Sequence, residues 1–569
     1  MSVSKTGLPN ILELEQGTFL VQFDLTQSED AMATGLATVG AKAVSTITPA
    51  HPDQGRGPLL LVEMLSDQAP EHSIETLSRL PGVAFAEVNA RVAIADMAAP
   101  SSAQDFVGVG MSLSGNLVLN VTPRSPGEAA HALTDVAPDV FLSPILDAPQ
   151  QRDGAHADPI ALNVDTDAAI TSPAPADQAE LVGDHLWTAP ESPGAPDFAD
   201  MSWVGALADL QTNVIVEGAL VYDKSYLNGS QWGMYGDKTA IVNPYGSQAG
   251  EAWAVSTGSM TSVVGVIDTG IDYTHPDLYR NVWLNQGEIP QALLVAGLKD
   301  RDGDNLITFR DLNDSGNAAF VTDLNKNGYI DAGDLLKDRR WADTYDGDDG
   351  NGKIDDLIGW DFVNNDNDPY DDNGHGTHVS GIIGAMGGNG VGVHGVNWDV
   401  QIVAMKFLGA SGSGSISGAV QAINYFTDAA IDASNAQINE NFVATNNSWG
   451  GTQNSQALSE AVTRGAQEGI LFIAAAGNNS VSTDAYTTSN YYLPNLSTND
   501  PLTGAGYDAV IAVASLTNSG ALSSFSNYGA ETVELAAPGS NIYSTLPGGS
   551  YGTMSGTSMA TPFVTGAVA

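Results

Sequence analysis

The stretch Val263-Val-Gly-Val-Ile-Asp-Thr-Gly-Ile-Asp272 combines an apolar run with an abrupt polar end. A short, nearly continuous apolar run is typical of a strand that is buried on both faces of a sheet. The run ends at Asp268, and Gly270 allows a tight exit from the strand. The stretch therefore predicts a central strand whose carboxyl end carries an acid.

Strands and helices are expected to alternate along the chain after this strand. Further strands are predicted at Ile402–Leu408, Ala444–Ser448, Leu471–Gly477 and Val510–Leu516. Helices are predicted at Thr377–Met386, Ser417–Ala433, Gln456–Glu468 and from Ser558 onward. This alternation favours an α/β fold with a doubly wound, mainly parallel sheet and helices on both faces. Right-handed crossovers would bring the strand ends and the following loops to one edge.

Acidic residues dominate the charged composition. The 569 residues include 67 Asp and Glu against 20 Lys and Arg, a formal net charge of -47. Such a field repels nucleic acid and anionic membranes, so neither is an expected partner. The chain has no cysteine, which excludes disulfides and thiolate chemistry. No apolar run approaches the length of a membrane span, and no signal peptide is visible at the N-terminus.

Residues 1–95 are expected to form a small α+β domain. Strand patterns occur at Thr18–Asp24, Leu59–Glu63 and Val83–Ile94, and helical patterns at Ser28–Val44 and Ile74–Leu80. Residues 96–222 are interpreted as a spacer, because residues 96–200 are rich in Ala, Pro, Asp and Ser. A weak echo of Leu77-x-x-Leu80-x6-Glu87 at Leu207 leaves open a second, similar unit inside this spacer.

The stretch Gly556–Pro562 places Ser558 at the expected N-terminus of a helix, with Pro562 tolerable in the first turn. A lone serine there is usually only a helix cap. A nucleophilic serine also needs a base, an acid that holds the base, and donors for an oxyanion. His375, Asp268 and Asn478 offer these groups at strand ends or helix starts. Their joint occurrence is far more specific than any single motif.

This constellation resembles the subtilisin-like serine proteases, the subtilases. The resemblance covers about residues 223–569 and follows the Asp, His, Ser chain order of that family. It rests on five stretches: DTGIDYTHPDL from Asp268, NGHGTHVSG from Asn373, NNSWGG from Asn446, AAAGN from Ala474 and GTSMATP from Gly556. The resemblance implies the subtilisin-like fold, preceded here by the small α+β domain.

The resemblance implies a role for each catalytic residue. Ser558 would be the nucleophile, and His375 the general base and acid. Asp268 would orient and support His375, while Asn478 and the backbone N–H of Ser558 would bind the oxyanion. His378 matches the family's second, non-catalytic histidine.

Three further segments match the family's substrate-binding parts. Two are expected to pair with extended substrate backbone, and the third to form one wall of the S1 pocket. They are Gly412, Ser413 and Gly414; Ser448, Trp449 and Gly450; and Ala475, Ala476 and Gly477.

The resemblance implies a secreted or cell-surface serine endopeptidase, made as a zymogen, that hydrolyses protein or peptide substrates through an acyl-enzyme. Residues 1–95 would be its intramolecular inhibitor, with cleavage between Ile94 and Asp223. A plain accessory domain is the alternative for residues 1–95. A catalytically silent scaffold serving as a binding module is the alternative for the whole chain. Related proteins continue past the helix that Ser558 begins, so a longer natural protein is expected.

An Asp-rich insertion, at about residues 299–340, predicts calcium binding. Asp323–Asp334 has the EF-hand spacing, with Gly328 at loop position 6 and Asp in place of the usual Glu at position 12. Its candidate ligands are Asp323, Asn325, Asn327, Asp331 and Asp334. Asp300, Asp302, Asp304 and Asp311 form a looser copy of this loop, and Asp346 to Asp356 is a candidate third copy.

Two more calcium sites are implied by the resemblance alone. Asp361, Asp366 and Asp368 match the medium-affinity loop of thermitase-like relatives. Asp223, Asp277 and Asn389 match side-chain ligands of the family's strong site. The alternative for all of these carboxylates is a solvated acidic surface adapted to high salt.

Overall fold

The computed structural model describes residues 17–50, 56–65, 69–94, 108–111, 117–120, 222–342, 349–451, 454–484, 493–499 and 504–569. The chain divides into two compact units, Met1–Ala99 with Ile215–Ala569, and Pro100–Val214. In the second unit the described residues form one antiparallel hairpin, β6 (Gly108–Met111) and β7 (Leu117–Asn120). The echo of the Leu77 pattern at Leu207 lies outside the described residues.

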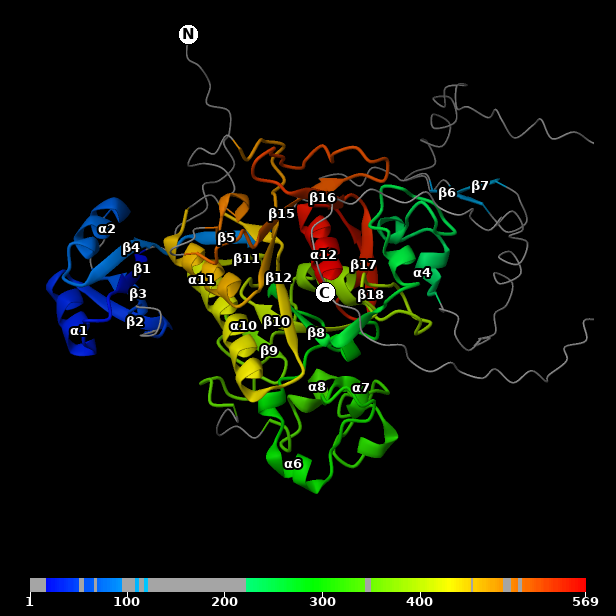
Figure 1. Ribbon diagram of the computed structural model, residues 1–569, viewed down its shortest axis with the longest axis horizontal. Helices are drawn as coiled ribbons and strands as arrows, with labels where there is room; N and C mark the ends of the chain where they lie inside the picture. Colours follow the sequence, from blue (N-terminus) through cyan, green and yellow to red (C-terminus); the bar gives the residue numbers. More distant parts are fainter. Residues whose placement is uncertain are drawn as a thin grey trace, which may run out of the picture. The chain divides into compact units, whose positions relative to one another are not determined.

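A parallel sheet of seven strands forms the centre of the first unit (Figure 1). Its order is β16-β15-β14-β12-β8-β10-β9, and every neighbouring pair is parallel. The strands are β8 (Gly258–Asp268), β9 (Gly359–Asp361), β10 (Asp399–Lys406), β12 (Asn441–Asn447), β14 (Leu471–Ala475), β15 (Val510–Leu516) and β16 (Leu535–Pro538). The predicted α/β fold with a mainly parallel sheet is confirmed. The strand patterns in the sequence did not predict β9 and β16, which are short edge strands.

Helices cover both faces of this sheet (Figure 1). On one face, α10 (Ile416–Ala436) and α11 (Gln456–Gln467) share a core with Val263 and Ile267 of β8. On the other, α9 (His375–Gly384) and α12 (Thr557–Val568) share a core with Val264 and Val266. Because successive strand residues face opposite sides, a strand covered on both sides must be apolar throughout.

The N-terminal part of the first unit is a small α+β domain, as predicted. Its antiparallel sheet has the order β2-β3-β1-β4, and it has an apolar core of its own. The elements are β1 (Thr18–Phe23), α1 (Glu29–Thr38), β2 (Ala41–Thr48), β3 (Leu59–Met64), α2 (Pro70–Ser78) and β4 (Val83–Val88).

Two expected elements of this domain were wrong in their extent. The helix predicted to reach Val44 stops at Thr38, because Gly40 takes a left-handed conformation (φ 71) and the β-branched residues after it form β2. The single strand predicted to reach Ile94 is divided into β4 and β5 (Arg91–Ile94). Only β4 joins the domain's own sheet, whereas β5 pairs elsewhere.

The insertion before α9 packs around a third apolar core, which includes Phe309, Leu312, Leu335 and Trp341. Its elements are short: η3 (Tyr279–Asn281), η4 (Gln286–Glu288), α6 (Gln291–Ala296), α7 (Phe309–Leu312), η5 (Ser315–Asn317) and α8 (Ala332–Leu335). The remaining elements of this unit are α4 (Lys224–Leu227), η2 (Trp232–Met234), α5 (Ala249–Ala252), β11 (Ser413–Ser415), β13 (Trp449–Gly450), η6 (Leu493–Asn495), β17 (Ile542–Leu546) and β18 (Ser550–Met554).

Candidate active site

Asp268 and His375 meet at the carboxyl edge of the parallel sheet. Asp268 is the last residue of β8, and His375 is the first residue of α9. His375 Nδ1 lies 2.7 Å from Asp268 Oδ1, and both side chains are buried. The backbone N–H of Thr269 also donates to this Asp268 oxygen, at 2.7 Å. The carboxylate therefore fixes the Nδ1 side of the imidazole and leaves Nε2 for proton transfer.

Asp371 organises the start of α9, a role that sequence reasoning missed. Its Oδ1 accepts hydrogen bonds from the backbone N–H of Gly374 and the hydroxyl of Thr269, both at 2.8 Å. Thr269 Oγ1 in turn accepts the N–H of Gly376 at 2.9 Å. The position of Asp371, just before the NGHGTH stretch, was the only available signal, and the local sequence does not show what it contacts.

Ser558 is the second residue of α12 and is fully buried. Its Oγ donates to the carbonyl oxygen of Ser448 at 3.1 Å, and Ser448 Oγ donates back to the carbonyl oxygen of Ser558 at 2.9 Å. Pro562 lies beyond the first turn of α12, not within it as expected. Proline has no N–H to give to the carbonyl four residues earlier, so the Ser448 hydroxyl supplies the missing donor.

Asn478 follows β14 and is joined to the first residue of α12. Its Oδ1 accepts from both the backbone N–H and the hydroxyl of Thr557, at 2.9 and 3.0 Å. With Oδ1 engaged in this way, the donor that the amide can direct elsewhere is Nδ2. The same contacts connect Asn478 to the N-terminus of the helix that carries Ser558.

The second histidine of α9, His378, is fully buried and contacts backbone carbonyl groups. Its Nε2 lies 3.0 Å from the carbonyl oxygen of Ile542 and 3.2 Å from that of Gly552. Burial lowers the pKa of His378 to about 3, and the neighbouring His375 contributes to the shift. A neutral His378 can donate from Nε2 to these carbonyls, which suits a structural role.

The segments expected to pair with substrate lie on either side of β5. Ser413 and Gly414 of β11 pair antiparallel with Ala93 and Val92. Trp449 and Gly450 of β13 pair antiparallel with Ile94 and Ala93. Ile94 also donates its backbone N–H to Gly412 O at 2.9 Å. Thus β5, from the N-terminal domain, is the middle strand of a three-stranded sheet.

The expected wall of the S1 pocket lies at the end of β14. Ala475 is the last residue of this strand, and both Ala475 and Ala476 are fully buried. Gly477 turns the chain with φ 100 and donates its N–H to Thr557 Oγ1 at 3.1 Å. The wall is therefore joined to the same threonine that contacts Asn478.

The two loops of the acidic insertion share one local structure. Asp311 accepts the backbone N–H groups of Arg301 and Thr308, and Asp334 accepts those of Leu324 and Asp331 at the same loop positions. Asp300 and Asp323 each accept backbone N–H groups from their own loop: those of Gly303 and Asn305, and those of Lys326, Asn327 and Gly328. The looser copy is thus a true structural repeat.

The acidic side chains lie closer together in the first loop than in the second. Among the described acidic residues, Asp300, Asp302 and Asp304 have oxygens within 4.8 Å of one another, whereas Asp323, Asp331 and Asp334 do not. In the second loop, the side-chain amides of Asn325 and Asn327 donate to Asp331 Oδ2. Asp331 Oδ1 is buried without a hydrogen-bond partner, which fits a cation ligand.

The first of the two sites implied by the resemblance forms a local cluster. Asp277 accepts the Asn389 side-chain amide at 2.7 Å, and Asp223 accepts the N–H groups of Gly388 and Gly390. Burial raises the pKa of Asp223 to about 6 and that of Asp277 to about 8. Two buried carboxylates at one loop fit a cation site.

The other implied site lies on one turn after β9. Asp361 and Asp366 exchange two backbone hydrogen bonds, of 2.9 and 3.2 Å. Asp368 accepts the Tyr273 hydroxyl at 2.6 Å, and the carboxylates of these three aspartates are not within 4.8 Å of one another.

A parallel sheet with an Asp–His pair at its carboxyl edge and a serine at a nearby helix N-terminus defines the subtilisin-like class of proteins. The profile of the subtilase family (Peptidase_S8) matches residues 259–569, more than half of the chain, and the chain belongs to this family. The resemblance carried by the five sequence stretches is thereby confirmed.

Several relatives have names that describe proteases. The thermophilic serine proteinase of Bacillus sp. (strain AK1) is 30% identical over 359 residues, covering 63% of this chain and 61% of that protein. Thermitase of Thermoactinomyces vulgaris is 39% identical over 215 residues, covering 38% and 66%. Subtilisin-like protease 1 of Plasmodium falciparum (isolate 3D7) is 33% identical over 313 residues, covering 54% and 36%. The chain thus spans only part of the length of these relatives.

Among solved structures, a cold adapted subtilisin-like serine proteinase aligns with 28% identity and a TM-score of 0.33, covering 54% of this chain and 73% of that chain. Within the described ranges, none of the helices has the length and apolar character that crossing a membrane requires.

Proposed function

We propose that the chain is a serine endopeptidase whose nucleophile is Ser558. The observation that carries this proposal is the buried contact of 2.7 Å between His375 Nδ1 and Asp268 Oδ1, at the same sheet edge as the start of α12. A buried carboxylate that accepts from Nδ1 selects the tautomer whose Nε2 can take a proton. The silent-scaffold alternative would not need this pairing.

Each residue then has a defined role in the reaction. His375 Nε2 takes the proton of Ser558 Oγ as this oxygen attacks the scissile carbonyl carbon, and Asp268 stabilises the imidazolium. The Nδ2 group of Asn478 and the backbone N–H of Ser558 donate to the oxyanion. His375 returns the proton to the leaving amine, and the C–N bond breaks to leave an acyl-enzyme. Water, deprotonated by His375, then releases the acid and restores Ser558.

Covalent labelling with a fluorophosphonate tests the nucleophile. Ser558→Ala should abolish labelling, whereas Ser555→Ala, a serine outside the proposed site in the same segment, should retain it. Equal labelling of both variants would refute the assignment of Ser558, whereas no labelling of the unaltered protein would favour the silent scaffold.

We propose further that residues 17–94 act as an intramolecular inhibitor. The support is β5, which pairs on both sides with the segments proposed to bind extended substrate backbone. A strand held between β11 and β13 excludes any other chain from these hydrogen bonds. The proposal includes processing after β5, in a part of the chain beyond the described residues.

Two side chains of the N-terminal domain contact helix N-termini of the larger domain. Glu87 accepts the Ser455 hydroxyl at 2.6 Å and the backbone N–H of Gln456 at 2.8 Å, at the start of α11. Asn89 accepts the N–H of Ser417 at 3.0 Å, at the start of α10. Acceptors at these positions satisfy otherwise unpaired N–H groups and complement the helix dipoles. This second set of contacts supports a dedicated inhibitor over an unrelated accessory domain.

We propose calcium as the ion that stabilises the acidic insertion. The support is the repeated loop structure and the buried Asp331 Oδ1 without a hydrogen-bond partner. Calcium would add to the positive charge that Arg310 supplies near Asp302, Asp304 and Asp311. The net charge of -47 fits a salt- and calcium-rich medium outside the cell, so we also propose that the protein is secreted or held at the cell surface.

A further inference from the structure

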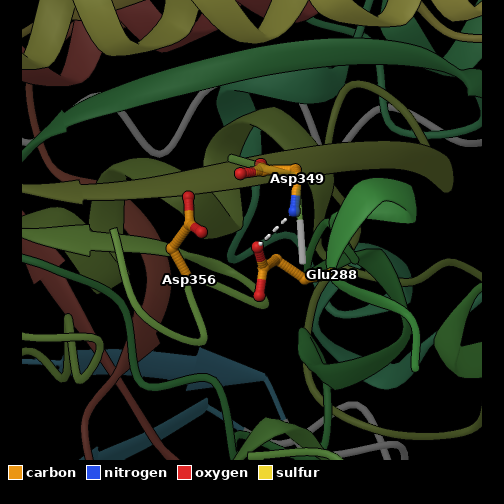
Figure 2. Close-up of side chains that lie close together, drawn as sticks. All are labelled: Glu288, Asp349 and Asp356. Atoms are coloured by element: carbon orange, nitrogen blue, oxygen red, sulfur yellow. Dashed lines mark hydrogen bonds between the residues drawn. The ribbon is translucent and has the colours of Figure 1, made fainter. Parts of the chain in front are cut away.

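Three carboxylates from two separate segments of the chain converge beside the insertion (Figure 2). Glu288 is the last residue of η4, while Asp349 and Asp356 belong to the segment that leads into β9. Ligand oxygens of all three lie within 4.8 Å of one another. The backbone N–H of Asp349 donates to Glu288 Oε1 at 3.2 Å, which holds the two segments together. Glu288 and Asp356 are buried, and Asp349 is exposed.

A second observation points to a ligand at this cluster. Asp356 is 0% exposed, and its Oδ1 is buried without a hydrogen-bond partner. Its other oxygen, Oδ2, accepts the hydroxyl of Tyr425 at 2.6 Å and the side-chain amide of Asn351 at 3.0 Å. A buried carboxylate oxygen without a hydrogen-bond partner carries a desolvation penalty. A cation at the centre of the cluster would remove this penalty.

One described cation, Lys353, is near enough to attract Asp356 electrostatically, but it forms no ion pair with the cluster. Neither Asp349 nor Asp356 forms an ion pair with a described lysine or arginine. The lysine between them in sequence, Lys353, has its Nζ 4.3 Å from the centre of the Trp360 ring. This cation–π position takes the ammonium group to an aromatic partner.

The donor set indicates the kind of ion. All candidate donors are carboxylate or amide oxygens, which hard cations prefer. Oxygens that lie within 4.8 Å of one another can all reach one ion. Calcium accepts six to eight oxygen ligands in flexible geometry, whereas magnesium demands a near-ideal octahedron and keeps several waters, so a site built from protein side chains suits calcium better. A cavity of about 690 Å³, lined by Asn285, Asp349 and Asn351, gives an entry path.

We propose that Glu288, Asp349 and Asp356 form a calcium site distinct from the two insertion loops. The bound ion would join η4 to the segment before β9 and, through Asp356 and Tyr425, to α10. This calcium-site proposal does not depend on the proposed protease activity.

The test counts bound ions in the full-length chain. Ser558→Ala protein, used to prevent self-digestion, is stripped with chelator and dialysed against calcium at fixed free concentration and ionic strength, and bound metal is measured by mass spectrometry. We expect Glu288→Gln and Asp349→Asn each to bind one calcium fewer per chain. Asp432→Asn, which removes a carboxylate from the same cavity wall, should bind the full number.

A second set of variants in the same experiment distinguishes this site from the sites in the insertion loops. Asp323→Asn should lose a different ion, so the double variant with Asp349→Asn should bind two fewer than the parent. An unchanged ion count in Asp349→Asn would overturn the proposal, whatever Asp323→Asn shows. Because Asp349 is exposed, this variant is expected to fold even if Glu288→Gln does not. Replacing calcium by magnesium should restore fewer ions at the same free concentration.

Discussion

Asp371 accepts hydrogen bonds from both the backbone N–H and the hydroxyl of Thr377, at 2.9 and 2.6 Å. Through its other oxygen it also holds Gly374, so a single buried carboxylate spans the first turn of α9. His375 lies inside this span. The orientation of the proposed general base therefore depends on a residue that does not contact it directly.

Loss of this carboxylate is expected to impair catalysis without removing any reacting group. Asp371→Asn should lower kcat about 10- to 100-fold, since small misplacements of a catalytic group have effects of this size. Thr377→Ala should show a smaller decrease in kcat, and Thr377→Ser, which keeps the hydroxyl, should retain most activity. Steady-state kinetics on a peptide substrate measure these effects. Full activity in Asp371→Asn would refute the positioning role.

Substitutions of Asn478 can separate the role of its Nδ2 donor from that of its Oδ1 acceptor. Asn478→Ala should lower kcat by about 10²–10³, or about 3 kcal/mol of transition-state stabilisation, with little change in KM. Asn478→Asp keeps an acceptor for Thr557 but loses the Nδ2 donor. If the donor matters, the Asp variant should be at least as impaired as the Ala variant. Recovery of activity in Asn478→Asp would instead indicate that the acceptor contact to Thr557 is what counts.

The contacts of Glu87 predict how tightly the N-terminal domain is held. When the N-terminal domain is added as a separate chain to the remaining enzyme, it should inhibit the enzyme. The inhibition constant should be about 10- to 100-fold weaker for the Glu87→Ala domain, which is the loss expected for hydrogen bonds to a charged group. Glu63→Ala, a half-exposed carboxylate paired with Lys42 of the same domain, is the matched control. Inhibition constants equal for both variants would contradict the proposed interface.

Glu440 predicts a pH dependence of stability. It accepts from Trp283 Nε1 and Gln401 Nε2, and burial raises the pKa of Glu440 to about 7. Between pH 4.5 and 7 the unfolded chain loses this proton first, so the folded state binds more protons and its stability falls as pH rises. Glu440→Gln removes the titration.

Denaturant unfolding at pH 5 and pH 8 measures this effect. The stability of the parent relative to Glu440→Gln should fall by roughly 1–3 kcal/mol from the lower to the higher pH. A difference that stays constant over this range would show that Glu440 titrates normally.

Calcium should raise the melting temperature of Ser558→Ala protein, because an ion that binds only the folded state stabilises it by mass action. Asp323→Asn should reduce the gain, and sodium at matched ionic strength should not replace calcium. Equal stabilisation by both salts would leave only the solvated acidic surface.

The sequence alone was sufficient for five of the seven strands of the central sheet and for candidate positions at its edge. Asp268, His375, Asn478 and Ser558 each lie where a strand ends or a helix begins, and such boundaries are marked by apolar periodicity and glycine within a few residues. Because parallel strands share one carboxyl edge, local boundaries also predict which loops gather there. The structure places Asp268 and His375 in contact, as this rule requires.

Other features depended on chain segments that are distant in sequence. The local sequence of β5 predicts a continuation of β4. Its pairing is set instead by the backbone hydrogen-bonding groups of β11 and β13, which are distant in sequence. Glu288 carries no local mark, yet it meets Asp349 and Asp356 across the insertion. The helix predicted past Gly40 ended early for a local reason, the left-handed backbone at that glycine. Strand partners and ion ligands are chosen by surfaces that exist only after folding, because hydrogen-bonding edges and buried charges gain their partners through tertiary contacts.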